Sequence, residues 1–149
     1  MTAHSIEQAR MAERELARRL RQSNASRMFG FELESAEGGR AVLRLRVRPK
    51  HKQVHRVVHG GVLAALADTA GGLACYTVVS RGTRMATVEM KINYLEAVDR
   101  GVLVAEAHVL RKGKNFIVVD CDVVDAGGRL AAKALMTFSF TPPEAKPRG

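Results

Sequence analysis

The pattern of apolar and polar residues divides the chain into one long apolar segment and several shorter periodic ones. Residues 62–79 are rich in Ala and Leu and begin with few β-branched residues. This composition predicts a buried helix of about five turns. Residues 5–22 carry apolar side chains at helical spacing, and Arg occupies many of the remaining positions. They predict a solvated amphipathic helix.

Alternation with a period of two predicts strands on both sides of the long helix. Residues 41–48 present one apolar face and one mostly basic face, which contains Arg44, Arg46 and Arg48. Four further strands are separated by short turn signals and cover residues 83–95, 102–110, 115–124 and 129–140. In the first of these four, Thr87 falls on the polar face of the alternation.

The predicted order is a helix, one or more strands, the long apolar helix and a four-stranded antiparallel meander. A helix this apolar must be covered, and a curved antiparallel sheet wrapped around it is the simplest cover. We therefore predict an α+β fold with a long central helix inside a curved sheet and an extra N-terminal helix. The expected division is an N-terminal extension (1–28), a main domain (29–141) and a flexible tail (142–149).

Composition and charge narrow the class of protein. The chain has 149 residues, of which 46% are hydrophobic and 26% are charged, as expected for one globular domain. Its formal charge of +9 favours an anionic partner, which is a nucleic acid, an acidic membrane or a phosphate-bearing small molecule. The polar N-terminus lacks the apolar core of a signal peptide, which predicts a cytoplasmic protein.

Two of these partners are disfavoured by local sequence. Residues 62–79 approach the length of a membrane span, but a central Asp68 costs about 2.5–3.5 kcal/mol on insertion, so we expect no membrane association. The stretch between Glu37 and Asp68 holds seven Lys and Arg residues and no acid, yet it contains no Phe, Tyr or Trp on which bases stack. Nucleic-acid binding therefore ranks last.

The two cysteines give no sign of a metal site. Cys75 and Cys121 lie in apolar surroundings without a CxxC spacing and without paired histidines at zinc-ligand distances. We expect two free, buried thiols and no bound metal.

Asp68 is the anomaly of the long helix. It is the only carboxylate between Arg56 and Arg81, and its neighbours one turn away are all Ala or Gly. Gly71 and Gly72 each cost a helix interior roughly 0.8–1 kcal/mol, so a packing or functional gain should offset them. Two interpretations stay open: Asp68 pairs with a buried Arg or caps a backbone group, or a second helix or a substrate approaches it.

The start of the same helix suits an anion. Gly60 and Gly61 stand where free backbone N–H groups and the positive end of the helix dipole favour negative charge. Asp68 follows about 10 Å further along the helix. Amide donors for an oxyanion together with a carboxylate base or nucleophile suit acyl transfer to water.

The run Val-His-Gly-Gly-Val-Leu-Ala-Ala-Leu-Ala-Asp-Thr-Ala-Gly-Gly, residues 58–72, resembles the signature of hotdog-fold acyl-CoA thioesterases of the phenylacetate-degradation (PaaI-like) type. That family has His-Gly-Gly, six residues, and then Asp or Glu on the central helix. The resemblance extends over about residues 29–140 and includes segments 87–94, 111–114 and 128–138. It implies the hotdog fold and hydrolysis of an acyl- or aryl-CoA thioester, with coenzyme A as part of the substrate and no metal or prosthetic group.

The resemblance also implies a role for each matching residue. Asp68 would activate water or attack the thioester carbonyl, and the Gly60 amide would hold the thioester oxygen. His59 would orient the loop, with a structural hydrogen bond to the backbone as the alternative. Gln53 would contact the reacting group or water. Thr87 would face the active site from the partner subunit, with a solvated strand residue as the alternative.

Further basic residues match the region where the family binds the phosphates of coenzyme A. Arg111, Lys112 and Lys114 would contact the phosphates, and Gly113 would allow close approach of the backbone; a solvated hairpin is the alternative. Arg56 stands where relatives often have Gly, three residues before the histidine. It would change the shape of that loop or add a phosphate contact.

The family forms dimers, commonly paired into tetramers, with each active site built from two chains, so a homo-oligomer is implied. The competing hypothesis within the same fold is a non-catalytic module that binds acyl-CoA. The sequence does not name the acyl group; candidates for lining its pocket are Met28, Phe29, Leu63, Tyr76 and Met85.

Overall fold

A computed structural model describes residues 3–143 of the chain. In chain order its elements are α1 (Ala3–Gln22), α2 (Asn24–Phe29), β1 (Glu32–Glu37), β2 (Arg40–Arg46), the 3-10 helix η1 (Pro49–His51), α3 (Gly60–Tyr76), β3 (Arg84–Tyr94), β4 (Val102–Lys112), β5 (Phe116–Val124) and β6 (Leu130–Thr141). The predicted flexible tail begins at residue 142, and residues 144–149 of it lie outside the described part of the chain.

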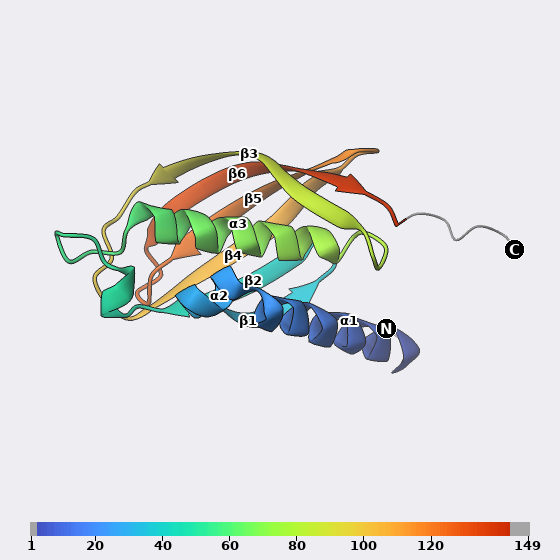
Figure 1. Ribbon diagram of the computed structural model, residues 1–149, viewed down its shortest axis with the longest axis horizontal. Helices are drawn as coiled ribbons and strands as arrows, with labels where there is room; N and C mark the ends of the chain where they lie inside the picture. Colours follow the sequence, from blue (N-terminus) through green and yellow to red (C-terminus); the bar gives the residue numbers. More distant parts are fainter. Residues whose placement is uncertain (1–2, 144–149) are drawn as a thin grey trace, which may run out of the picture.

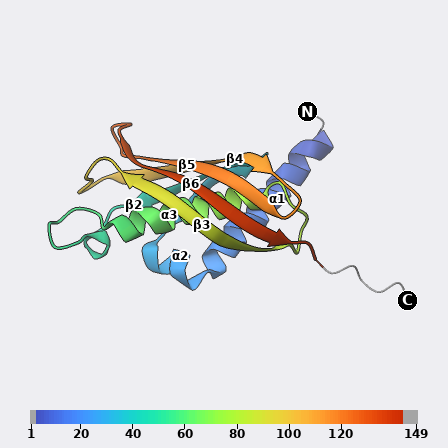
Figure 2. The same ribbon diagram turned by 90° about the horizontal axis from the view of Figure 1, so that it is seen from above.

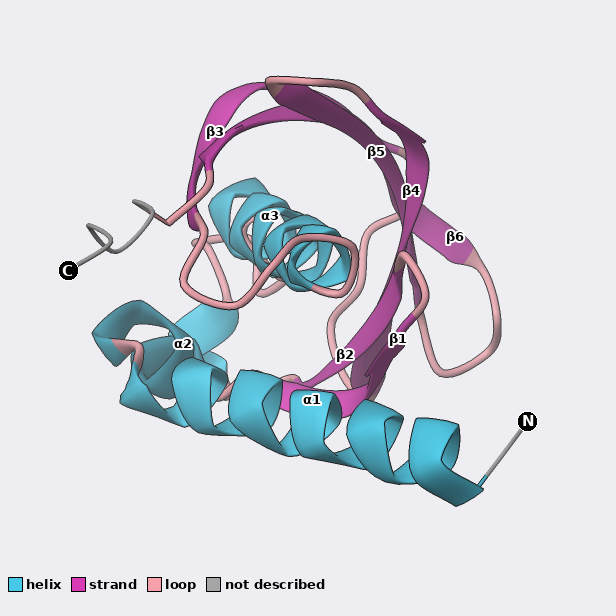
Figure 3. Cartoon of the chain, turned by 90° about the vertical axis from the view of Figure 1, so that its right-hand side faces the viewer, coloured by secondary structure: helices cyan, strands magenta, loops and turns pink. Residues whose placement is uncertain are grey.

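The strands form one six-stranded antiparallel sheet in the order β1-β2-β4-β5-β6-β3. The sheet curves around α3, and α1 and α2 lie on the side of α3 that the sheet leaves open (Figures 1 and 3). Side chains from the inner face of the sheet and from α3 form one core, with Leu66, Leu103 and Met136 fully buried in it. The expected hotdog arrangement with an extra N-terminal helix is confirmed.

The predicted four-stranded meander is wrong in one respect. Strands β4, β5 and β6 do form a meander, but β3 pairs with β6 at the far edge of the sheet and not with β4. The segment after β3 does not close a hairpin, because its backbone is held elsewhere: Leu95 donates to Ala131 O at 2.8 Å, and Val58 donates to Val98 O at 2.7 Å. This connection carries the chain across the end of the sheet, so that β4 pairs with β2.

The ends of the helices follow local capping. Helix α3 begins at Gly60, two residues before the prediction, because the His59 side chain caps it by accepting the Gly61 N–H at 2.8 Å. It ends at Tyr76 because Thr77 caps its C-terminus. Helix α2 was not predicted; Ser23 caps its start by accepting the Ser26 N–H, and Gly30 ends it in the left-handed conformation.

Helix α1 is more than a solvated extension. Leu16 and Leu20 are buried and belong to the core, while the helix packs along β1. Seen from above, α1 crosses beneath the sheet, and α2 projects beyond it next to β3 (Figure 2). This places the C-terminal turn of α1 next to α3, where the candidate site lies.

The basic face of β2 points to the outer side of the sheet. Arg40 forms an ion pair with Glu106 at 2.8 Å, and Arg44 lies 3.5 Å from Glu34. Part of the positive charge of this strand is therefore matched by acidic side chains on its neighbours, as cross-strand pairing favours.

Candidate active site

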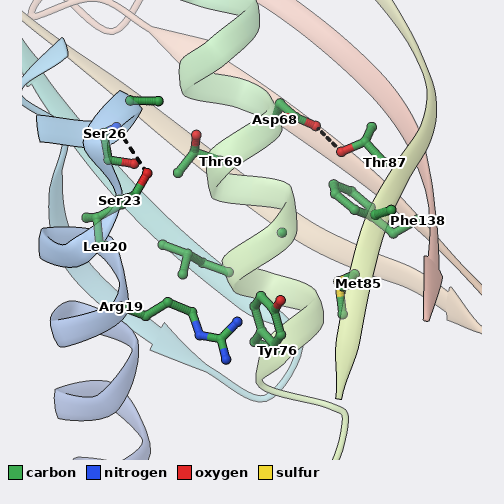
Figure 4. A pocket seen from close by; sticks show the side chains of 14 residues that line it. Arg19, Leu20, Ser23, Ser26, Asp68, Thr69, Tyr76, Met85, Thr87 and Phe138 are labelled. Carbon is green, nitrogen blue, oxygen red and sulfur yellow. Dashed lines mark hydrogen bonds between the residues drawn. The ribbon is translucent and has the colours of Figure 1, made fainter. Parts of the chain in front are cut away.

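A pocket of about 290 Å³ opens beside the middle of α3. One face of the helix lines it with Asp68, Thr69, Gly72, Leu73 and Tyr76, which follow the i, i+1, i+4, i+5, i+8 spacing of a single helical face. The opposite wall comes from β3 and β6, and the third from the α1–α2 junction (Figure 4). The pocket therefore brings together three parts of the chain that are distant in sequence.

Asp68 and Thr87 face each other across the pocket. The Thr87 hydroxyl donates a hydrogen bond to Asp68 Oδ1 at 2.7 Å (Figure 4). No Arg and no backbone N–H within residues 3–143 bonds to this carboxylate. The structure therefore contradicts the interpretation of Asp68 as a structural ion pair or helix cap. The carboxylate is half-buried and reaches the open pocket.

A β-bulge turns Thr87 toward Asp68. The alternation of the sequence assigns Thr87 and Glu89 to the same polar face, but the register shifts between them, with Thr87 opposite Phe138 and Glu89 opposite Thr137. Val88 is the extra residue, and its side chain is exposed. Because one inserted residue reverses which face the following side chains occupy, Thr87 points inward while Glu89 points outward.

The two adjacent glycines of α3 have different surroundings. A Cβ on Gly71 would lie 2.7 Å from Met136 Cε and 3.1 Å from the Phe138 ring, so both side chains would have to move to admit it. A Cβ on Gly72 would meet only Phe138, at 3.7 Å, and Gly72 lines the pocket. The first glycine leaves room for these two side chains, and the second leaves space in the pocket.

The N-terminus of α3 presents a free amide. The His59 side chain accepts the Gly61 N–H, which is the structural hydrogen bond to the backbone named above as the alternative for His59. The Gly60 N–H has no acceptor within the described residues. Gly60 packs against the Tyr94 ring, which a Cβ would approach to 3.2 Å. One unpaired donor at the positive end of a helix dipole is suited to an anion.

The loop before α3 is closed by hydrogen bonds of Gln53. Its backbone N–H donates to Val57 O at 2.9 Å, and its side-chain oxygen accepts the His55 N–H at 2.6 Å. Arg56 in this loop has a φ of 65°, the left-handed region that glycine adopts at no steric cost. Arg56 thus adopts a backbone conformation that favours glycine, the residue that the resemblance leads us to expect at this position.

Within one chain, the predicted catalytic residues divide into two groups. Asp68 and Thr87 line the pocket, whereas Gln53, His59 and Gly60 do not. Eight residues of helix separate Gly60 from Asp68, which corresponds to about 12 Å along the axis.

The predicted phosphate-binding residues are likewise divided. Arg111 and Lys112 end β4, and the turn that follows them closes with Gly113 N–H donating to Phe116 O at 2.8 Å. The Lys112 ammonium lies 5.8 Å from the centre of the Phe140 ring. Arg56 belongs to the loop at the opposite end of α3 (Figure 1), and the helix is about 25 Å long. The structure therefore groups the hairpin residues and separates Arg56 from them.

The N-terminal helices supply pocket residues that the sequence analysis missed. Arg19 and Leu20 of α1, together with Ser23 and Ser26 around the start of α2, line the pocket. The sequence feature that could have indicated these residues is Ser23, because a serine that caps a second helix marks a change of chain direction. Of the residues considered for the acyl pocket, Tyr76 and Met85 line it, whereas Met28, Phe29 and Leu63 do not.

The described residues show no sign of a cysteine nucleophile or of a metal site. Burial raises the pKa of the Cys75 and Cys121 thiols to about 12, so neither is a nucleophile at neutral pH. No group of three or more His, Cys, Asp or Glu side chains in residues 3–143 is arranged to hold a metal ion. No helix in the same range combines the length and apolar character needed to cross a bilayer.

Comparison with known proteins adds a family. The model of the family described as "Thioesterase superfamily" matches residues 55–132. A provisionally named esterase of Saccharolobus solfataricus is 38% identical over 114 residues, which cover 74% of this chain and 81% of the relative. Human acyl-coenzyme A thioesterase 13 is 31% identical over 117 residues, covering 76% of this chain and 83% of the relative. A conserved Pseudomonas aeruginosa protein of known structure superimposes with a TM-score of 0.80 and 34% identity, over 84% of this chain and 99% of that one.

Proposed function

The chain belongs to the thioesterase superfamily and is a thioester hydrolase, and from this premise we propose that it hydrolyses an acyl- or aryl-coenzyme A ester to the free acid and coenzyme A. The observation that carries the proposal is the half-buried Asp68 carboxylate, which accepts the Thr87 hydroxyl in an open pocket on the central helix. The naming of the human relative as an acyl-coenzyme A thioesterase supports the coenzyme A moiety.

In the proposed reaction Asp68 is the catalytic carboxylate. As a general base it takes a proton from water while the water oxygen bonds to the thioester carbon. The carbonyl oxygen becomes an oxyanion, which a free amide such as that of Gly60 stabilises. The carbon–sulfur bond then breaks, and the coenzyme A thiolate leaves and takes up a proton. In the alternative route, Asp68 attacks the carbonyl itself, and water hydrolyses the resulting anhydride.

Thr87 fixes the orientation of the base in this scheme. Its hydroxyl occupies Asp68 Oδ1, so the other carboxylate oxygen remains available to water. A side chain held by one hydrogen bond on a rigid helix loses less freedom in the transition state than a free one. Thr87 is therefore a positioning residue of the same chain as the Asp68 that it holds.

A second copy of the chain would complete the site. Strand β3 is an edge strand, and Val88, Tyr94 and Leu95 expose about half of their side-chain surface along it and just after it. An unpaired sheet edge with exposed apolar side chains favours pairing with another strand. Pairing there would cover Tyr94 and bring the helix N-terminus of one chain toward the pocket of the other. A homodimer, or a tetramer of two dimers, follows from this proposal.

The hairpin that contains Arg111, Lys112, Gly113 and Lys114 is the proposed seat of the coenzyme A phosphates. Its cationic side chains are exposed, and Gly113 lies at the turn where the backbone approaches closely. The alternative is a solvated hairpin without a ligand. The cytoplasmic location expected from the sequence stays a prediction.

Hydrolysis of a panel of acyl- and aryl-CoA esters at neutral pH tests the proposal. We expect turnover of at least one ester and a decrease in kcat of about 10²–10⁴-fold in Asp68→Asn, which retains the shape but not the base. Asp99→Asn is the matched control, since Asp99 is exposed and pairs only with the adjacent Arg100. Saturable binding of the esters without turnover by the wild-type protein would instead favour the non-catalytic acyl-CoA-binding module.

A further inference from the structure

We propose that Arg19 recognises a carboxylate at the far end of the acyl group, so that the preferred substrates are ω-carboxyacyl thioesters. This inference rests on the proposed function, because it assigns the acyl group to the pocket that contains Asp68. It concerns the opposite end of that pocket from the reacting carbonyl.

The pocket is a slot along α3 with chemically different ends. Asp68 and Thr87 form one end, and Tyr76 and Arg19 form the other (Figure 4). Eight residues of helix separate Asp68 from Tyr76, which corresponds to about 12 Å. The intervening wall is small or apolar, with Gly72, Leu73 and Met85. A thioester carbonyl at Asp68 would therefore direct an extended hydrocarbon chain toward Arg19.

Arg19 forms no ion pair within 4 Å among the described residues, although its charge is one of those that lower the pKa of Glu15. Its guanidinium stacks on the Tyr76 ring, with the central carbon 4.2 Å from the ring centre. Glu15, one turn earlier on α1, is engaged by Arg18 at 2.7 Å and by Arg81 at 3.7 Å. Stacking orients the planar group while leaving its N–H donors free, and these donors match the geometry of a carboxylate.

The polar groups of the α1 and α2 wall are distributed along the pocket. The side chains of Ser23 and Ser26 also line this wall of the pocket. These serines lie level with Thr69 and Asp68, so Arg19 is the charged donor at the Tyr76 end of the pocket (Figure 4). Arg19 is exposed, so beside a hydrocarbon ester its guanidinium stays with water, whereas a terminal carboxylate gains a charged, forked contact that the hydrocarbon ester lacks.

A pair of matched esters measures this preference. Adipyl-CoA and heptanoyl-CoA have similar length and differ in the terminal carboxylate, and suberyl-CoA and nonanoyl-CoA form a longer pair. The variants are Arg19→Met, which keeps the length of the side chain, Arg19→Lys, which keeps the charge but loses the fork, and Arg21→Met. Arg21 is an exposed residue of the same helix turn that does not line the pocket, so it controls for the change in net charge.

We expect wild-type kcat/KM to favour the carboxylated member of at least one pair. This ratio should fall by about tenfold, or about 1.4 kcal/mol, in Arg19→Met. It should fall less in Arg19→Lys and stay unchanged in Arg21→Met. The inference is overturned if the wild type prefers the neutral ester in both pairs, or if Arg19→Met lowers kcat/KM equally for both members of each pair, which would indicate a contact with coenzyme A itself.

Failure of the proposed function would look different. In that case no ester of the panel is turned over by the wild-type protein. Calorimetric binding of the same ester pairs then still measures the ratio, and an unchanged ratio in Arg19→Met would overturn the inference independently.

Discussion

At the scale of single residues, the backbone amide of Gly60 offers the sharpest test of the oxyanion role. Proline at this position would remove the N–H and leave the helix start in place, because proline is well tolerated at the first position of a helix. The preceding His59 has φ −64° and ψ 136°, which is the extended conformation that a following proline requires. The amide can therefore be deleted without breaking the helix.

We expect Gly60→Pro to lower kcat by about 10²–10³-fold, the usual effect of losing one oxyanion donor. Gly60→Ala is the matched control, since both variants place a Cβ about 3.2 Å from the Tyr94 ring, and only Pro lacks the N–H. Steady-state kinetics measure kcat of the two variants, and circular dichroism checks that both are folded. Equal activity in the two variants would show that the Gly60 amide does not hold the oxyanion.

The buried thiol of Cys75 makes stability depend on alkaline pH. Desolvation raises its pKa from the usual 9 to about 12. The folded state therefore holds the proton over a range in which the unfolded state has released it. The contribution of the neutral thiol is fully present below pH 9 and is lost as the pH rises from about 9 toward 12.

Wild-type protein should accordingly lose up to about 1.4 kcal/mol of unfolding free energy per pH unit above pH 9 beyond the loss of Cys75→Ala. Urea unfolding of both proteins at pH 8, 9 and 10 measures the difference. Parallel curves would contradict the assigned pKa. Slow reaction of Cys75 with thiol reagents in the folded protein is the companion observation that burial predicts.

At the scale of elements, the sequence pattern predicted the long helix but did not predict which side chains of β3 point toward that helix. The Ala and Leu content of α3 and the isolation of Asp68 on it identified both the core helix and the central residue of the site. The bulge at Val88 has no local signature, since its alternating neighbours continue the period of two. The alternation alone placed Thr87 on the polar face, the resemblance placed it at the active site facing from the partner subunit, and the sheet register turns it toward Asp68 of its own chain.

The order of the strands was also predicted only where it is encoded locally, in the turns, and not where it depends on contacts between distant residues. Turn residues between β4, β5 and β6 correctly indicate hairpins, because a hairpin is encoded by the residues in its loop. The pairing of β3 with β6 involves residues almost fifty positions apart, such as Met90 and Met136. Such a pairing is selected by the whole core and not by any turn.

The adjacent glycines of α3 allow a prediction about this element. Gly72→Ala should raise the unfolding free energy by up to about 1 kcal/mol, because alanine favours the helix and its Cβ meets only ordinary contacts. Gly71→Ala should lower it, because the Cβ would press on the buried Phe138 ring at 3.1 Å as well as on Met136 Cε at 2.7 Å. Thermal or urea unfolding of the two variants checks the opposite signs.

The Gly71→Ala and Gly72→Ala variants also distinguish an effect on core packing from an effect on the pocket. Gly72 lines the pocket and Gly71 does not, so Gly72→Ala narrows the slot while it stabilises the helix. We expect kcat/KM for long acyl esters to fall more than that for acetyl-CoA in Gly72→Ala. An equal effect on all chain lengths would contradict the assignment of this slot to the acyl group.

At the scale of the whole molecule, the two groups of site residues require an explanation. Asp68 and Thr87 share a pocket from which Gly60, His59 and Gln53 are absent, although the resemblance assigns all five to one active site. Sequence spacing alone does not show whether such groups meet within one chain, because a rise of about 12 Å along a helix is compatible with one large site or two half-sites. The exposed β3 edge favours the second possibility.

Mixing two inactive variants distinguishes these arrangements. In a symmetric dimer whose sites each take Gly60 from one chain and Asp68 from the other, a mixed dimer of Gly60→Pro and Asp68→Asn has one site with both defects and one site with none. If each site instead belongs to a single chain, every site in the mixture carries one defect. The two architectures thus predict different activities from the same protein preparation.

We expect an equimolar mixture, unfolded and refolded together, to regain about a quarter of wild-type activity, since about half of the dimers are mixed and one of their two sites is intact. Each variant refolded alone is the control for residual activity. Val88→Lys on the exposed β3 edge adds a second readout, because like charges that face each other across the interface should oppose pairing and shift the protein toward the monomer in sedimentation. A mixture no more active than its components, from variants that remain dimeric, would show that one chain contains a complete site and that the free Gly60 amide serves another purpose.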